Sequence, residues 1–376
     1  MRFLRISWVS LSLLVSLAWV GAPLHGSAQD ATPAAVTESS ATADFPNGMT
    51  FDLRATIDGD VSSVDLVYAQ ANLETLELIT ATFTQDGSDL TASADADFTI
   101  NFLPVGIDLT YHWVITLADE SVHETQPQTA TWIDDRFDWD VATGAGVEIY
   151  SYERSADFVQ FMLTTAEDAV VAMKDLFQPE ETWPIRIWAY ASSEDYAGTL
   201  ATNSQEWSAG SAYPDLQVIQ AVIPDDDQDE VLRVLPHEVS HQILHMATLN
   251  PFNGPATWID EGLATHAQIG GTEAYPRIVA DAIAEGSILG LSSLISAFPF
   301  DPTQARLAYA ESYSAIGFIK EQWGDDGIRA IVLAYRAGNS HEDVIQIALG
   351  MSLSDLQDAW LASVGNGASV NPGGTN

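Results

Sequence analysis

The spacing of apolar residues changes in character once along the chain, near residue 146, and this change sets the fold class. From about residue 45 to residue 143, apolar side chains recur at every second position, as at Ile107, Leu109 and Tyr111. This period indicates half-buried strands of an antiparallel β-sandwich. Beyond Val147, helical and extended patterns alternate, and the last third is helical. The sequence therefore predicts an α+β fold, with an N-terminal antiparallel β-sandwich followed by a mixed sheet and a mainly helical domain.

Composition divides the chain further. Its beginning has Arg2 and Arg5, then an apolar stretch too short for a stable membrane anchor, then small residues, which is the order of a cleavable signal peptide. Ala, Thr and Ser dominate the next segment, and Gly, Asn and Pro the last one, as is typical of flexible chain. The predicted segments are a signal peptide (1–28), a flexible linker (29–44), an immunoglobulin- or fibronectin-type-III-like β-sandwich (45–145), a second domain (147–364) and a disordered tail (365–376).

The signal peptide predicts secretion, to the exterior or the cell envelope, with no stable membrane insertion once it is cleaved. Retention of the segment as an anchor is the alternative.

Within the second domain, the patterns predict elements that precede and follow a histidine cluster. Strands are expected to form a mixed sheet against the helix that carries this cluster. The expected elements are a helix at 155–177, strands at 185–191 and 216–223, a helix at 325–337, and helices starting at Ser340 and Ser352, each with an acidic residue three positions on.

The formal charge of −40 at pH 7 restricts the partners of this protein. A chain so acidic repels nucleic acid, so we expect no nucleic-acid partner. The acidic run at residues 225–230 either binds surface Ca²⁺ or stabilises the N-terminus of a helix, where the helix dipole favours acidic side chains. Because the chain has no cysteine, packing and bound metal must supply its stability after export.

The segment His237-Glu-Val-Ser-His241 has the pattern of a zinc site. In a helix, the two histidines lie on one face, one turn apart, so both reach one ion, and Glu238 reaches the water of that ion. Histidines that only form hydrogen bonds are the structural alternative. His245 is about 12 Å along the axis from His237, too far to share an ion bound at about 2 Å. Ala247 stands where the metzincin motif needs histidine, which excludes that class.

A third ligand is expected from a second helix, which follows a proline-containing turn. In Trp258-Ile-Asp-Glu-Gly-Leu-Ala264, Glu261 would face back toward the first helix. One carboxylate and two imidazoles leave zinc an open position for water, as hydrolysis requires. His266 is either close to the site or solvent-facing.

Together these segments resemble the gluzincin zinc metallopeptidases, specifically the peptidase MA-like group related to the M1 aminopeptidases. The resemblance covers about residues 147–364 and implies a zincin-like domain that binds one Zn²⁺ per chain, with Glu261 as third ligand. Tyr309, which leads a further similar segment, is implied to donate a hydrogen bond to the tetrahedral intermediate, with Tyr313 as the fallback. Residues 210–220 resemble the edge strand beside the cleft of this group.

Two features depart from the group. The G-x-M-E-N segment that holds a free amino terminus in the M1 aminopeptidases is absent, so exopeptidase action is not implied. Pro236 precedes His237 and predicts a kink, or a helix that restarts with proline in its first turn.

The expected function is that of a secreted zinc endopeptidase acting on peptides or proteins, with Glu238 as general base. The alternative is a catalytically inactive secreted binding or adhesion protein, in which the β-sandwich does the work.

Overall fold

Two antiparallel sheets made by the first third of the chain share one hydrophobic core. The computed structural model describes residues 32–33, 35–70, 76–99, 102–199 and 210–368. One sheet has the order β2-β3-β7-β6, and the other has the order β1-β9-β8-β4-β5 with β10 beside β8, antiparallel except for β1 with β9. The strands are β1 (Thr32–Pro33), β2 (Ala35–Asp44), β3 (Gly48–Thr56), β4 (Val61–Gln70), β5 (Glu77–Thr80), β6 (Thr82–Asp86), β7 (Asp89–Asp97), β8 (Asp108–Leu117), β9 (Val122–Glu124) and β10 (Gln128–Thr131).

Alternate residues of these strands enter the core, as the period of two predicts. In β8 every second residue is buried, and Trp113 is fully inaccessible. Phe51 of β3 packs edge-on against Tyr111 of β8 with ring centroids 4.9 Å apart. Such cross-sheet aromatic contacts stabilise a β-sandwich beyond the area they bury.

Strand β2 corrects the predicted linker. We expected residues 29–44 to be flexible, but Ala35–Asp44 pairs with β3 along almost its whole length. Most of its side chains are exposed. Because main-chain hydrogen bonds hold this edge strand, it needs no apolar alternation, and its Ser, Thr and Ala residues gave no strand signal. The predicted signal peptide and residues 29–31 and 34 lie outside the described residues.

A mixed sheet follows, with both faces covered. Its order is β11-β12-β13-β15-β14, in which β12, β13 and β15 are parallel and the two outer strands are antiparallel. Along β13, Ile187 joins the core under the helices, while Trp188 joins the core shared with the sandwich. This double burial explains the near-continuous apolar runs of the inner strands. The strands are β11 (Asp140–Thr143), β12 (Val147–Ser151), β13 (Ile185–Tyr190), β14 (Gly210–Tyr213) and β15 (Val218–Val222).

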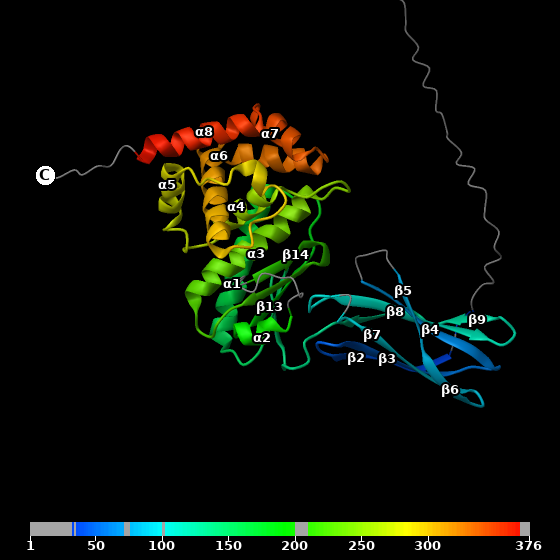
Figure 1. The fold of residues 1–376 in the computed structure, drawn as a ribbon. Helices are drawn as coiled ribbons and strands as arrows, with labels where there is room; N and C mark the ends of the chain where they lie inside the picture. The colour runs from blue at the N-terminus through cyan, green and yellow to red at the C-terminus, as the bar shows by residue number, and fades with distance from the viewer. Residues whose placement is uncertain (1–31, 34, 71–75, 100–101, 200–209, 369–376) are drawn as a thin grey trace, which may run out of the picture.

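The C-terminal region is mostly helical and lies on the side of the mixed sheet away from the sandwich (Figure 1). This arrangement confirms the predicted α+β class. The helices are α1 (Ala156–Phe177), α2 (Ser193–Ala197), α3 (Gln228–Thr248), α4 (Thr257–Ala267), α5 (Tyr275–Glu285), α6 (Pro302–Arg336), α7 (His341–Leu349) and α8 (Leu353–Ala368), with 3-10 turns at Pro214–Leu216 and Leu291–Leu294.

The predicted helix ends agree with the structure in most places. Ser340 caps α7 through the backbone N–H of Asp343, as the capping pattern predicts. The helix expected at 325–337 is the second half of α6, which departs from helical geometry at Gly324 (φ 63°). Helix α8 continues to Ala368, so residues 365–368 are helical where a disordered tail was expected, and residues 369–376 lie outside the described residues.

Among the described residues, no helix combines the length and the apolar character that crossing a bilayer requires.

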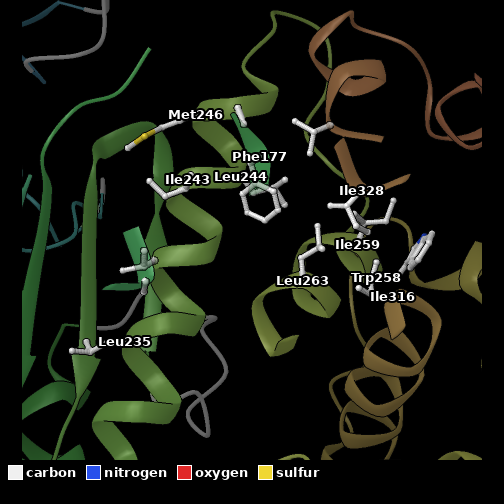
Figure 2. Packing of buried hydrophobic residues seen from close by; sticks show 14 of the residues in the cluster. Phe177, Leu235, Ile243, Leu244, Met246, Trp258, Ile259, Leu263, Ile316 and Ile328 are labelled. Atoms are coloured by element: carbon white, nitrogen blue, oxygen red, sulfur yellow. The ribbon is translucent and has the colours of Figure 1, made fainter. Parts of the chain in front are cut away.

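The packing of α3 against α1 and the sheet leads to a stability prediction. Ile243 is fully buried in the helical core (Figure 2). Ile243→Ala leaves a cavity and should lower the free energy of unfolding by about 2–5 kcal/mol. The same substitution at Ile347, which is 60% exposed on α7, should change it by no more than about 0.5 kcal/mol. Urea denaturation measures both, and equal losses would contradict the assigned core.

Candidate metal centre

Helix α3 presents His237 and His241 side by side. Its N-terminus is capped by the Asp227 carboxylate, which accepts a hydrogen bond from the backbone N–H of Glu230 at 3.0 Å. Because the two histidines are four residues apart, their rings share one face, with centroids 4.9 Å apart. The acidic run at 225–230 therefore has a structural role. Asp225 also faces Arg154 at 3.5 Å, and within the described residues this run forms no group that could hold a metal ion.

Pro236 lies inside α3, and the helix passes through it. Proline has no N–H, so the carbonyl oxygen of Leu232 loses its helical partner. The backbone N–H of Ile269, just beyond α4, donates to this oxygen at 3.0 Å. Of the two alternatives expected at Pro236, a kink or a restarted helix, the restart is wrong, because α3 runs from Gln228 to Thr248 without interruption. A partner from outside the helix replaces the missing donor. This hydrogen bond joins α3 to the end of α4.

Helix α4 brings Glu261 back against α3. Trp258 and Ile259 are buried in the helical core, where they anchor α4 (Figure 2). Gly262 allows α4 to approach α6 closely, since a Cβ there would lie 2.8 Å from the carbonyl oxygen of Ser312. This packing of α4 fixes the position of the preceding residue, Glu261, relative to α3.

The carboxylate of Glu261 meets both imidazoles. Its Oε2 atom lies 3.3 Å from His237 Nε2 and 3.6 Å from His241 Nε2. This oxygen is buried, and within the described residues it has no hydrogen-bond partner. One ligand atom from each of the three residues lies within 4.8 Å of the others. Two imidazole nitrogens and one carboxylate oxygen are a donor set of catalytic zinc sites, so these residues fit a single Zn²⁺.

Asp260 contacts His241 and His245, a role that the sequence interpretation missed. Its Oδ1 lies 2.6 Å from His241 Nδ1, and its Oδ2 lies 2.8 Å from His245 Nε2. A carboxylate on the second ring nitrogen fixes the orientation of a metal-binding imidazole. The available signal was an acidic residue next to Glu261 and a histidine one turn beyond His241.

Charge around His241 favours its protonated form. Burial alone would lower its pKa, but the carboxylates of Asp260 and Glu261 outweigh burial and raise the pKa to about 10. A metal ion must therefore displace a proton from this imidazole.

Glu238 lies beside the metal group and is almost completely buried. Burial raises the pKa of its carboxyl group, against the effect of His237 and His241, which lower it. A carboxylate with a raised pKa is a stronger base. Strand β14 comes close at this point, because a Cβ on Gly210 would lie 2.5 Å from Glu238 Oε1.

Tyr309 of α6 reaches the same place. Its ring centroid is 6.4 Å from that of His237, and its side chain forms a hydrogen bond with Glu261. Burial, followed by the negative charges of Glu261 and Glu238, raises its pKa well above the usual value, so the phenol keeps its proton. Tyr313, the alternative from the sequence, stacks instead on His266 with centroids 4.2 Å apart. The backbone carbonyl of Tyr313 also faces His266 Nε2 at 2.8 Å, so His266 is not brought to the metal group.

Two cavities meet at this centre. The larger, of about 580 Å³, lies between β14 and the metal group and contains Glu261 and Phe300 in its lining. The smaller, of about 350 Å³, extends toward α5 and the start of α6. Both are lined by Gly210, His237, Glu238 and Tyr309. Glu238 therefore faces space on two sides.

This chain matches one known family and has low similarity to several solved structures. Residues 165–366 match the Peptidase MA superfamily, and no curated protein matches the sequence. An aminopeptidase N family protein from Idiomarina loihiensis is 10% identical with a TM-score of 0.31, over 89% of this chain and 73% of that one.

Two further solved structures show weaker similarity. A cycloalternan-degrading enzyme from Trueperella pyogenes is 11% identical with a TM-score of 0.19, over 29% of this chain and 16% of that one. A family 76 glycoside hydrolase from a bovine Bacteroides thetaiotaomicron strain is 8% identical with a TM-score of 0.19, over 87% of this chain and 50% of that one.

The contacts of Asp260 generate a prediction for metal affinity. Asp260→Asn removes the charge behind His241 and should weaken zinc binding by about 10–100-fold. Competition with a chromophoric chelator measures the affinity. Asp281→Asn, an exposed change on α5, is the matched control and should leave the affinity unchanged. Equal affinities of the Asp260→Asn and wild-type proteins would show that Asp260 does not support the site.

Proposed function

We propose that this chain, which belongs to the Peptidase MA superfamily, is a secreted zinc-dependent endopeptidase. The observation that carries the proposal is the meeting of His237, His241 and Glu261 beside a buried Glu238. A site that only stabilised the fold would have no use for a general base next to its ligands.

When bound by these three residues, zinc would acidify a water molecule and polarise the peptide carbonyl group. Glu238 takes the proton from the attacking water, because its carboxylate adjoins the metal group and burial makes it more basic. It then gives this proton to the leaving amine. Tyr309 donates its phenolic hydrogen to the oxyanion that develops on the carbonyl oxygen, and the raised pKa keeps that hydrogen in place.

The two cavities support cleavage within a chain. Because Glu238 and Tyr309 line both cavities, a substrate has space on each side of the scissile bond. Strand β14 is the last strand of its sheet and contributes Ser211 and Ala212 to the larger cavity. An extended peptide can add to such an edge through main-chain hydrogen bonds.

Two substitutions test the centre. Glu261→Ala removes one ligand and should abolish binding of one zinc per chain, which elemental analysis measures. Glu238→Gln should keep the zinc but lower the rate of peptide cleavage by about 10²–10⁴-fold, because the base is lost. A peptide library analysed by mass spectrometry supplies the activity assay.

Tyr309→Phe belongs in the same assay and should lower kcat by about 10²–10³-fold, while Tyr313→Phe should have little effect. Full activity of Glu238→Gln would contradict the assigned base. Absence of zinc from the wild-type protein would favour the alternative, an inactive binding or adhesion protein.

Secretion is part of the proposal and rests on the sequence of residues 1–28. Expression in a secreting host should give exported protein that begins near Gln29, as N-terminal sequencing would show. An intact N-terminus on membrane-bound protein would instead indicate a retained anchor.

A further inference from the structure

The smaller cavity is lined by two arginines, in a protein that is otherwise strongly acidic. The chain has 13 Lys and Arg residues against 53 Asp and Glu residues. Arg233 and Arg306 both line this cavity, which begins at Glu238 and Tyr309. If both arginines were paired with nearby carboxylates, they would have a structural role only. Their contacts therefore decide whether they are available to bind a ligand.

Arg306 has no such partner. In the ranges that the structure describes, every other Lys and Arg except Lys174 forms an ion pair. Arg306, the fifth residue of α6, is exposed and lines the cavity. An unpaired cation here attracts an anion that enters the cleft.

Arg233 is held in place and keeps donors to spare. Its Nε donates to Glu230 Oε2 at 2.9 Å, and its Nη2 donates to Glu230 Oε1. Its Nη1 has no hydrogen bond to any described residue. Gly271 lies against the stem of this side chain, since a Cβ there would be 3.2 Å from Arg233 Cδ. A fixed guanidinium loses little entropy when it binds a further acceptor.

Thr265 adds a buried donor. Its side chain lines the cavity and is 1% exposed, and its Oγ1 has no hydrogen-bond partner among the described residues. A buried hydroxyl group without a hydrogen-bond partner is energetically unfavourable. A ligand that places an acceptor beside Thr265 would remove this penalty.

Building on the proposed function, we propose that this cavity binds a carboxylate group of the peptide, next to the bond that is cleaved, through Arg306, Arg233 and Thr265. Peptides offer this group from two sources, an Asp or Glu side chain and a free C-terminus. A site with unpaired donors also disfavours a neutral group, because the donors then stay unsatisfied. The cavity thus selects substrates as well as binding them.

Binding without turnover tests this proposal directly. Zinc-loaded Glu238→Gln protein is titrated by calorimetry with three peptides: acetyl-Ala-Glu-Ala-amide, acetyl-Ala-Gln-Ala-amide, and acetyl-Ala-Gln-Ala with a free carboxyl group. One of the two peptides with a carboxylate should bind about 10-fold more tightly than the neutral amide. Preference for the first identifies a side-chain carboxylate, and preference for the third identifies the C-terminus.

Added substitutions separate the pocket from the metal. Arg306→Gln should reduce the preference to less than about 2-fold, because the unpaired charge is gone. Arg277→Gln is the matched control, because this arginine is highly exposed on α5 and does not line the cavity. A preference that survives Arg306→Gln would come from the zinc ion and would overturn the proposal, as would equal binding of all three peptides.

The readout does not depend on cleavage. If wild-type protein cleaves no peptide but the carboxylate preference is present and lost in Arg306→Gln, the proposed function fails and the binding pocket stands. If cleavage occurs without any preference, the pocket fails and the proposed function stands.

Discussion

A buried carboxylate oxygen between two imidazoles is the contact that the packing of the helical region has to maintain. Glu261 Oε2 can stay beside His237 and His241 only if α4 is fixed against both α3 and α6. Gly262 permits the close approach to α6, and the hydrogen bond from Ile269 to the carbonyl that Pro236 frees ties the far end of α4 to α3. Burial of an oxygen without a donor is unfavourable by itself. Packing of the surrounding helices therefore stabilises a constellation that becomes favourable once a cation is present.

Side chains of opposite charge lie close together at this centre, with carboxylates around the metal group and arginines in the smaller cavity. Carboxylates around the metal group favour positive charge there, and they raise the pKa of His241. The adjoining smaller cavity is lined by Arg233 and by Arg306, which has no acidic partner in the described part of the chain. Glu238 lies at the boundary of the two regions, and burial keeps it more basic than a surface carboxylate. Carboxylates and arginines thus lie close together at this centre, inside a protein whose net charge would by itself repel acidic peptides.

Local periodicity made the fold class and most elements predictable, whereas pairings between distant residues were not. The two periods of apolar residues predicted the antiparallel sheets and the helices, and His237 to His241 share a face simply because of their spacing. Strand β2 was missed because an edge strand of small polar residues has no apolar pattern. Asp260 was missed because its partner His241 is 19 positions earlier on another helix. The continuity of α3 through Pro236 was also unpredictable, because the replacement donor comes from beyond α4.

The aromatic contacts beneath the mixed sheet limit how this protein can be divided. Trp188 stacks on Tyr150 with centroids 4.2 Å apart and meets Trp139 at 4.8 Å, in the core that includes the sandwich. Removing everything before Val147 would expose Trp188 and Tyr190, which are now almost wholly inaccessible. A fragment with such an apolar face would tend to aggregate. The region from Val147 onward is therefore not a portable module, and a recombination event that transferred it alone would have to supply a new cover for this face of its sheet.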